Sequence, residues 1–359
     1  MSKPHYYGLI LAGGRGTRFW PRSRRKHSKQ VLPILGDRTL IQATVDRLSP
    51  AIPPERLWVL TNDHLRDVIV RQLPTVPQRQ ILAEPAQRNT APAIGLAAHI
   101  LKSVDQDAVM GVFPSDHVIG RPSRYLQFVR AAFGAADRGK IGVLGILPRW
   151  PETGYGYIEL LRGAKPGSLV PAPVSSFREK PDLKTAVKYL AAKRFYWNAG
   201  MFFWRASVVI DALRRYLPKT ASILATLPAF GHRQFNQKLR EAFPLCENIS
   251  IDYAVLERAD NVVGLACDEI GWNDVGSWNA VYELHAKDRH RNAARSTIVS
   301  HASTDNFIDA GDKLVAILGV SNLVVVDTPD ALLIADRNCA QQVGEIVKLL
   351  ELNERHDLL

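Results

Sequence analysis

The sequence has little cysteine. Cys246, Cys267 and Cys339 are the only three among 359 residues, and they lie far apart along the chain. An odd, scattered set of cysteines makes neither a disulfide framework nor a cysteine-based metal site. This usage is typical of a reducing compartment, so we expect a cytoplasmic location.

Long apolar runs are also missing. No stretch approaches the roughly 20 apolar residues of a membrane helix, which excludes a protein that crosses the membrane on helices. The apolar segment 6–12 is too short for a secretion signal and leads directly into glycines. With 46% hydrophobic and 23% charged residues, the composition excludes disordered and fibrous chains. The length predicts a globular protein of about two domains.

Negative charge is in shorter supply than positive charge. The sequence has 46 Lys and Arg against 35 Asp and Glu, a formal net charge of +11. This excess indicates an anionic partner, and composition alone leaves nucleic acid, a membrane surface and a phosphorylated small molecule open.

Short apolar runs alternate with amphipathic stretches in the first half of the chain. The runs 8–11, 57–60, 108–113 and 141–145 are apolar without alternation, which is typical of strands buried on both faces. Between them, apolar residues at helical spacing from Ile94 to Leu101 predict a helix capped by Asn89 or Thr90. The alternation predicts a Rossmann-like α/β fold. We expect a mixed, mostly parallel sheet with helices on both faces and ligands at the carboxyl ends of its strands.

The last part of the chain has a different pattern. Short strand-like runs separated by Asp, Gly, Asn and Pro occupy 296–300, 306–310, 314–318, 323–327 and 331–335. They predict a small all-β unit, a coil of stacked short strands, and the apolar spacing from Val343 to Leu350 predicts a terminal helix. The charged stretch 286–292 marks the boundary, so we expect domains at 1–288 and 289–359.

The clearest binding signal follows the first predicted strand directly, and it reads Leu11-Ala12-Gly13-Gly14-Arg15-Gly16-Thr17-Arg18. Three glycines in four positions let backbone N–H groups approach phosphate oxygens, and Arg15 and Arg18 add positive charge. A tight turn with surface arginines is the alternative. The spacing excludes a P-loop, and Phe19 stands where a dinucleotide fingerprint needs glycine or alanine.

A basic segment comes next, with five Lys or Arg among the eight residues 22–29. Such a run could bind nucleic acid. It lies between the glycine-rich segment and the apolar residues 31–34, however, so we expect much of it to fold over the same pocket as a triphosphate clamp.

These residues carry a family resemblance. Gly13 to Arg18, the pair Lys29-Gln30 and Pro33 resemble the signature of sugar-1-phosphate nucleotidylyltransferases. Residues 19–24 are similar to the variant found in mannose-1-phosphate guanylyltransferases (GDP-mannose pyrophosphorylases). The chain departs from the family at Ser28, where proline is usual, which could loosen the loop but leaves its charge in place.

The resemblance extends to a nucleotide-facing segment with Glu84, Arg88, Asn89 and Thr90, and it implies that residues 11–17 also bind the nucleotide. Guanine presents two adjacent donors, N1–H and the N2 amino group, and one carboxylate such as Glu84 can accept from both. The alternatives are a strand-end charge at Glu84 and a helix cap at Asn89 or Thr90.

Two distant acids are candidate metal ligands. Asp116 follows the buried run 109–113, at the carboxyl end of a predicted strand, although an Asp there is often only a helix cap. Asp274 lies in a segment that resembles the family's second metal motif. Together they could bind Mg²⁺, which takes one or two carboxylates along with phosphate oxygens. The resemblance implies catalytic roles for Arg18, Lys29, Asp116 and Lys180.

The resemblance also assigns a sugar-phosphate site to Tyr155, Gly156, Glu179, Lys180 and Asn198. It implies the reaction GTP + α-D-mannose 1-phosphate ⇌ GDP-mannose + diphosphate, with Mg²⁺ as cofactor and no nucleic-acid or membrane partner. It further implies a short left-handed β-helix that serves packing and homodimer formation. Because the sequence ends at Leu359, we expect no additional isomerase domain.

Two other functions remain open from the sequence. One is an enzyme of the same fold with another nucleotide or sugar specificity. Residues 84–90 favour guanine over another base. The other is a basic nucleic-acid-binding module, which would show steeply salt-dependent affinity and would need neither Asp116 nor Asp274.

Overall fold

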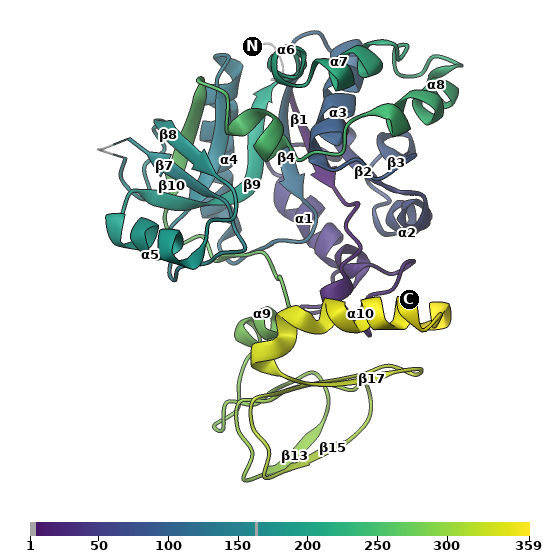
Figure 1. The fold of residues 1–359 in the computed structure, drawn as a ribbon, viewed down its shortest axis with the longest axis vertical. Helices are drawn as coiled ribbons and strands as arrows, with labels where there is room; N and C mark the ends of the chain where they lie inside the picture. Colours follow the sequence, from purple (N-terminus) through teal and green to yellow (C-terminus); the bar gives the residue numbers. More distant parts are fainter. Residues whose placement is uncertain (1–4, 162–163) are drawn as a thin grey trace.

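The computed structural model describes residues 5–161 and 164–359. A central sheet runs through the larger, upper part of the molecule (Figure 1). Its strands are β1 (Tyr6–Leu11), β2 (Leu57–Asn62), β3 (Ile81–Glu84), β4 (Val109–Pro114), β6 (Ile141–Ile146), β7 (Tyr157–Leu160), β8 (Ala172–Arg178), β9 (Phe195–Arg205) and β10 (Val262–Cys267). Their order is β3-β2-β1-β4-β9-β6-β10-β8-β7, with β7 also pairing with β9.

The sheet is mixed, as the sequence predicts. Strands β3, β2, β1 and β4 are parallel neighbours, and Leu11 at the end of β1 pairs with both Leu60 and Pro114. Strand β9 then runs antiparallel to β4 and to β6, while β10 is parallel to β6. The carboxyl ends of β3, β2, β1 and β4 therefore share one edge, and segments that follow these strands meet there.

Helices cover both faces of the sheet (Figure 1). Their bounds are α1 (Leu40–Leu48), α2 (Asp63–Gln72), α3 (Thr90–Val104), α4 (Pro122–Asp137), α5 (Leu183–Ala192), α6 (Ala206–Tyr216), α7 (Pro218–Ala225) and α8 (Phe235–Ala242). Side chains alternate between the faces: Leu9 packs in the core with α3 and α6, and Ile10 packs in the core with α1 and α4. The predicted α/β class is confirmed.

The predicted helix 94–101 is part of α3, and the structure selects its cap. The side chain of Asn89 accepts a hydrogen bond from the backbone N–H of Thr90 at 2.9 Å. Asn89 therefore satisfies one of the free donors at this helix end.

The C-terminal part is a β-helix-like unit that narrows away from the central sheet (Figure 1). Its strands are β12 (Ala293–Ala294), β13 (Ile298–His301), β14 (Phe307–Asp309), β15 (Val315–Leu318), β16 (Leu323–Asp327) and β17 (Leu332–Asp336). Parallel pairing joins β12, β14 and β16 on one side and β13 and β15 on another, which confirms the coil. The last run differs, because β17 folds back antiparallel to β16 and closes the stack.

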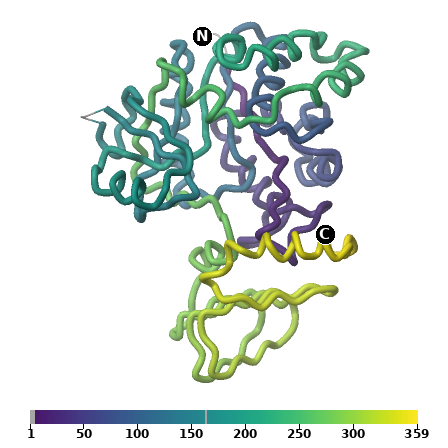
Figure 2. Tube along the Cα trace, viewed as in Figure 1, coloured from purple at the N-terminus to yellow at the C-terminus, as the bar shows by residue number. Residues whose placement is uncertain are grey.

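Two further helices, α9 (Trp278–Leu284) and α10 (Val343–Leu352), lie between the β-helix-like unit and the central sheet (Figure 1). A third hydrophobic core joins Phe19 and Trp20, which follow the glycine-rich segment, to Trp278 of α9 and Val347 of α10. The indole N–H of Trp278 donates to the carbonyl of Trp20 at 3.1 Å. The C-terminal helix and the glycine-rich segment are thus packed side by side, as the tube in Figure 2 also shows.

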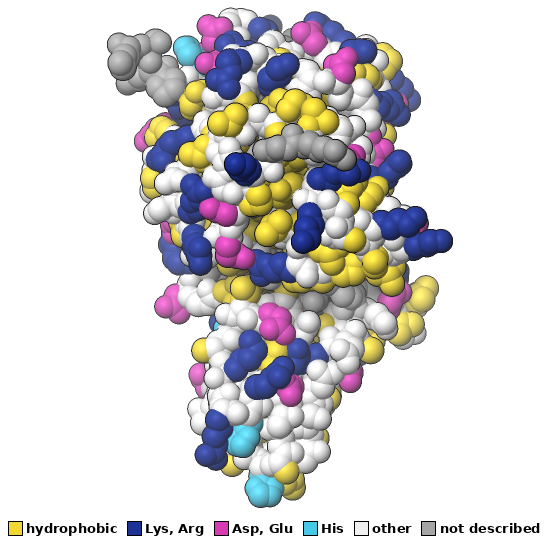
Figure 3. Space-filling model, turned by 90° about the vertical axis from the view of Figure 1, so that its left-hand side faces the viewer, with side chains coloured by type: hydrophobic (Ala, Val, Ile, Leu, Met, Phe, Trp, Pro, Cys, Tyr) yellow, Lys and Arg dark blue, Asp and Glu magenta, His cyan; other side chains and the backbone are white. Residues whose placement is uncertain are grey.

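Two classes of protein considered from the sequence can be compared with the structure: a protein that crosses a membrane and a basic nucleic-acid-binding module. No helix in the described part of the chain combines the length and apolarity needed to cross a bilayer. On the face drawn in Figure 3, Lys and Arg side chains are interspersed with hydrophobic and acidic ones, so the described residues of this face form no continuous basic track.

Candidate active site

A cavity of about 460 Å³ opens at the carboxyl edge of the parallel strands. It brings together candidate residues from three separate segments: Leu11, Gly13, Gly14, Glu84, Arg88, Asn89, Thr90 and Asp116. A neighbouring cavity of about 450 Å³ shares Gly13 and Glu84 with it and is also lined by Arg15. Eight of the eleven predicted nucleotide residues and one predicted metal ligand therefore line these neighbouring cavities, whereas Ala12, Gly16 and Thr17 line neither.

Polar side chains donate hydrogen bonds to the backbone carbonyls of the glycine-rich segment. The carbonyl of Ala12 accepts from Thr61 Oγ1 at 2.9 Å and from Gln30 Nε2 at 2.8 Å. Gln30, which is buried, also donates to the carbonyl of Gly14 at 3.1 Å. Since these contacts occupy the carbonyls, Gln30 positions the segment. From the sequence, Gln30 is only part of the family signature, and its supporting role was not predicted.

Gly16 lies where the glycine-rich segment meets Lys29. Its φ of +62° is in the left-handed region, and a Cβ on Gly16 would lie 2.7 Å from Lys29 Cβ and 2.9 Å from Lys29 N. Glycine is therefore required at this position both by backbone conformation and by space. The short 3₁₀ helix Thr17–Phe19 begins directly after it.

We expect Gly16→Ala to lower the free energy of unfolding by on the order of 1–3 kcal/mol through strain at this position. Gly14→Ala is the matched control, because a Cβ on Gly14 would meet nothing within 4 Å. Denaturant unfolding of both variants tests this. Equal stability of the two would contradict the close packing of Gly16 against Lys29.

The two arginines of the glycine-rich segment contact the C-terminal part of the chain. Arg15 Nη2 donates to Glu351 Oε1 at 2.6 Å, and Arg18 Nη1 donates to Gln341 Oε1 at 2.7 Å. Arg15 lines the neighbouring cavity, and residues more than 300 positions away orient both guanidinium groups.

Lys29 joins the two candidate metal ligands. Its ammonium lies 2.8 Å from Asp116 Oδ2 and 2.8 Å from the backbone carbonyl oxygen of Asp274. Burial works against the charged form of Asp116, but the Lys29 ammonium more than offsets it and holds the pKa of this carboxyl below its usual value. Two residues that are 158 positions apart in sequence thus contact one ammonium, Asp116 through its carboxylate and Asp274 through its backbone carbonyl.

One neighbour orients Asp274, and His117 follows Asp116 in the sequence. The hydroxyl of Tyr155 donates to Asp274 Oδ1 at 2.6 Å, and burial together with Asp274 raises the pKa of Tyr155, so it remains a donor. Trp272 Nε1 donates to His117 Nδ1 at 3.2 Å, and burial lowers the pKa of His117. His117 is therefore neutral at pH 7 and adds no charge to the site.

Glu84 has an unusual environment for a carboxyl group. Its Oε1 atom is buried without a hydrogen-bond partner, and burial raises the pKa of Glu84 to about 8. Its other oxygen lies toward Gly13, where a Cβ would come within 3.4 Å. Buried polar atoms are nearly always paired, so an unpaired acceptor that faces a cavity indicates a place for a ligand's donor.

Three other residues of the nucleotide-facing segment also hold the local structure. Arg88 Nη2 donates to the carbonyl of Pro244, Asn89 caps α3, and Thr90 Oγ1 accepts from the N–H of Ile251 at 2.9 Å. The alternative role of Asn89 as the cap of α3 is thus confirmed, and Asn89 also lines the cavity.

The predicted sugar-phosphate residues form a second cluster. Glu179 pairs with Lys180 at 3.0 Å, and a Cβ on Gly156 would collide with the Glu179 carboxylate. Asn198 Nδ2 donates to Asp252 Oδ1 at 3.0 Å. Tyr155, next to Gly156 in sequence, connects this cluster to Asp274.

Asp252, which is not among the residues predicted for the site, is also a member of this cluster. Burial and the nearby Glu179 carboxylate raise the pKa of Asp252 to about 7. Its sequence neighbourhood carries no glycine-rich or charged pattern that would mark a site. Only the fold brings Asp252 to Asn198.

The acid pair suits a divalent cation. Lys29 places a positive charge against the Asp116 carboxylate and the backbone carbonyl of Asp274, and one or two carboxylates with phosphate oxygens and water are a donor set that Mg²⁺ takes. Among the described residues, no group of three or more His, Cys, Asp and Glu side chains forms a candidate metal cage.

Comparisons with known proteins agree with this geometry. The model of the nucleotidyl transferase family matches residues 7–291, and that of the MannoseP isomerase/GMP-like beta-helix domain matches residues 296–350. A mannose-1-phosphate guanylyltransferase of Escherichia coli K12 is 39% identical over 366 residues, which cover 99% of this chain and 76% of that protein.

Two further relatives extend the comparison. The mannose-1-phosphate guanylyltransferase RfbM of Salmonella typhimurium is 40% identical, over 97% of this chain and 73% of that protein. A solved structure from Thermus thermophilus, titled as a mannose-1-phosphate geranyltransferase, is 33% identical with a TM-score of 0.85. That superposition covers 97% of this chain and 100% of the other.

Proposed function

The chain belongs to the nucleotidyl transferase family, and from this membership we propose that it transfers GMP from GTP to α-D-mannose 1-phosphate, with release of diphosphate. The observation that carries the proposal is the meeting of Lys29, Asp116 and Asp274 beside the glycine-rich segment. The choice of substrates is supported by the two mannose-1-phosphate guanylyltransferases that match this chain over 99% and 97% of its length.

The reaction needs positioning and charge neutralisation more than acid–base chemistry. A phosphate oxygen of mannose 1-phosphate attacks the α-phosphorus of GTP in line, the P–O bond to the β-phosphate breaks, and diphosphate leaves with the electron pair. The attacking phosphate is already ionised, so no strong base is required. Backbone N–H groups of residues 13–17, with Arg15, Arg18 and Lys29, hold the triphosphate.

The sugar-phosphate cluster holds the nucleophile. Lys180 binds its phosphate. Glu179 accepts hydrogen bonds from sugar hydroxyls, and Asn198 donates hydrogen bonds to them. Asp252, hydrogen-bonded to Asn198, fixes the orientation of that amide. Tyr155 orients Asp274 between this cluster and the nucleotide.

Asp116 and Asp274 are the proposed ligands of a divalent cation, Mg²⁺ in the first place. Such an ion supplies charge neutralisation to phosphate oxygens when bound. Lys29 complements it, because its ammonium holds Asp116 ionised before any ion arrives.

Glu84 is the proposed guanine-reading residue. The ionised carboxylate accepts from N1–H and from the N2 amino group of guanine, whereas adenine offers no such donor pair. Since hydrogen bonds to a charged partner contribute about 1.5–3 kcal/mol, we expect Glu84→Gln to lower the preference for GTP over ATP by about 10- to 100-fold. Glu55→Gln, an exposed carboxyl before β2, is the control and should leave the preference unchanged.

Glu84 also predicts a pH dependence. With its pKa at about 8, the carboxyl is mostly neutral at pH 7 in the free protein and ionises as the pH rises through 8. The affinity for guanosine should therefore rise from pH 7 to pH 8.5 in the native protein and stay flat in Glu84→Gln. Calorimetric titration with guanosine, which carries no phosphate to titrate, measures this. A flat profile in the native protein would remove the role of Glu84.

The function itself is tested by diphosphate release from GTP with mannose 1-phosphate, with glucose 1-phosphate or with no sugar phosphate, each with and without Mg²⁺. We expect release only with mannose 1-phosphate and Mg²⁺. A higher rate with ATP, UTP or dTTP, or with glucose 1-phosphate, would assign a different specificity to the same fold.

Three broader features complete the proposal. Residues 1–288 form the catalytic domain and residues 289–359 the β-helical one, which the two family-model matches support because they meet close to this boundary. The protein acts as a homodimer through the β-helical domain. It works in the cytoplasm, to which its three free cysteines are suited.

A further inference from the structure

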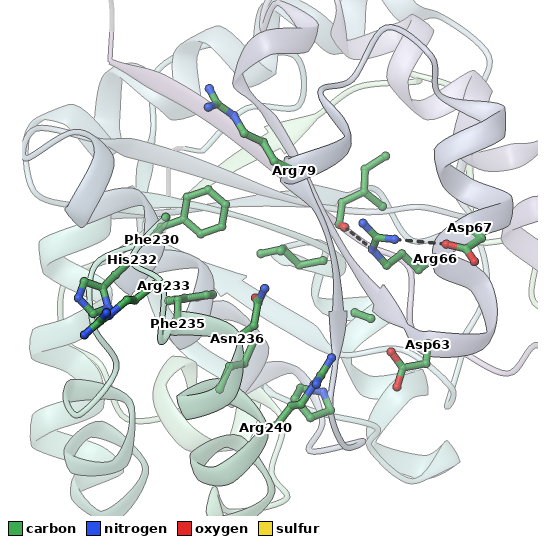
Figure 4. A pocket seen from close by; sticks show the side chains of 16 residues that line it. Asp63, Arg66, Asp67, Arg79, Phe230, His232, Arg233, Phe235, Asn236 and Arg240 are labelled. Atoms are coloured by element: carbon green, nitrogen blue, oxygen red, sulfur yellow. Dashed lines mark hydrogen bonds and ion pairs between the residues drawn. The ribbon is translucent and has the colours of Figure 1, made fainter.

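A third cavity, of about 900 Å³, lies at the outer edge of the central sheet (Figure 4). Its walls come from α2, from the edge strand β3, from residues 230–233 and from α8. No residue assigned above to the nucleotide, the sugar phosphate or the metal lines it. The proposed reaction therefore leaves this cavity without a role.

The cavity is lined by an excess of arginine. Arg66, Arg79, Arg233 and Arg240 surround it, as Figure 4 shows, against the two carboxylates of Asp63 and Asp67. They come from separate segments of the chain and converge only in the fold.

One of these arginines is engaged within the protein. Arg66 donates to Asp67 Oδ1 at 3.2 Å and to the carbonyl of Ile81 at 3.2 Å. Within the described ranges, no hydrogen bond or ion pair involves the other three, Arg79, Arg233 and Arg240. Three positive charges around one hollow thus lack an anionic partner.

The floor of the cavity is apolar. Ile81, Phe235 and Leu239 are buried there, and Phe230 is partly buried. The ring of Phe230 packs edge-on against Trp58, with centroids 4.9 Å apart, and against Phe235 at 5.4 Å. Such a floor is preorganised for a ring or sugar face, while the rim supplies charge for an anionic group.

We propose that this cavity binds a phosphorylated small molecule of about the size of a nucleotide, separately from the catalytic site. Small-molecule sites are typically about 300–1,000 Å³ with an apolar lining and few polar groups. Guanidinium groups match phosphate oxygens in charge and in paired donor geometry. Free anions of this kind would supply the partners that the three arginines lack.

The position of the cavity links it to the nucleotide site. Strand β3 ends at Glu84, and Asp63 and Pro85 line both this cavity and the one that contains Glu84 and Arg15. A ligand bound here would stiffen the wall on which Glu84 is mounted. We therefore expect occupancy to change the KM for GTP at least twofold and to leave the identity of the products unchanged.

Calorimetric titration with inorganic diphosphate, and in a second arm with ADP, tests the proposal in the absence of GTP. The native protein should bind two equivalents of either probe, one at the glycine-rich segment and one here. The triple variant Arg79→Ala/Arg233→Ala/Arg240→Ala should bind one. Because all three side chains are exposed, this variant should keep the native unfolding midpoint.

The matched control is Arg38→Ala/Arg214→Ala/Arg355→Ala, which removes three exposed arginines elsewhere and should keep both equivalents. The same number of equivalents in the native protein and in the cavity variant would overturn the proposal. The proposal would also be overturned if the triple arginine variant lost affinity for a single-stranded RNA but bound diphosphate and ADP as the native protein does. Loss of the second equivalent would stand even if the protein proved inactive on GTP and mannose 1-phosphate, so the two proposals can fail separately.

Discussion

Replacing Asp274 by asparagine is expected to lower kcat on the order of 10²–10³-fold, the typical effect of removing one charge contact in a preorganised site. Asparagine keeps the shape of the side chain and can still accept from the Tyr155 hydroxyl, which lies 2.6 Å away. What it removes is the negative charge opposite Lys29 and Asp116. The loss should therefore come from weaker cation binding and not from local unfolding.

The measurement is kcat as a function of Mg²⁺ concentration. Asp274→Asn should need a higher concentration of Mg²⁺ for half-maximal rate, whereas Tyr155→Phe, which loses only the hydrogen bond, should show a smaller change. Asp268→Asn removes a carboxylate that pairs with Arg124 at the surface, and it should behave as the native protein. A native Mg²⁺ dependence in Asp274→Asn would exclude this residue as a ligand.

The second large effect is expected at Lys29. Lys29→Met removes a buried ammonium that lies 2.8 Å from Asp116 and close to the glycine-rich segment, so kcat/KM for GTP should fall on the order of 10²–10³-fold. Methionine retains the length of the side chain and its packing near the Phe19 ring, which lies 5.4 Å from the ammonium.

Lys29→Met should also change the pH profile in a defined direction. Without the ammonium, burial is opposed only by His117 and a backbone hydrogen bond, so the pKa of Asp116 should rise. The acidic limb of the kcat/KM profile, which reports ionisation of this ligand, should therefore move to higher pH. Lys188→Met, which removes an exposed lysine on α5, should move neither the rate nor the profile. A loss of rate without any movement of the acidic limb would mean that Lys29 acts only on the triphosphate.

Residues whose role follows from local pattern were predictable from the sequence. The glycine-rich segment follows a buried strand, and so does Asp116, and parallel strands place such segments at one edge of a sheet. For the same reason Glu84 at the end of β3 reaches the same cavity. The inferences on the glycine-rich segment and Asp116 needed only strand periodicity and the topology rule for α/β folds, whereas Glu84 was marked by the family resemblance, because no strand was predicted before it.

Residues whose role depends on long-range packing were not predictable in this way. Gln30 supports the glycine-rich segment through two backbone carbonyls, Asp252 meets Asn198 across 54 positions, and Glu351 reaches Arg15 across 336. No periodicity connects such partners, because only tertiary packing brings them together, as where α10 packs against residues 19–20 and places Glu351 beside Arg15. The same holds for the arginine-lined cavity, whose walls come from separate segments.

A crystal structure with a non-hydrolysable GTP analogue, mannose 1-phosphate and Mg²⁺ would show whether Asp116 and Asp274 share an ion at the triphosphate. We expect one ion at about 2.0–2.1 Å from carboxylate oxygens of both Asp116 and Asp274 and from an α-phosphate oxygen. We also expect the β- and γ-phosphates on residues 13–17 and guanine on Glu84. An ion that contacts neither acid, or a triphosphate bound away from the glycine-rich segment, would contradict this expectation.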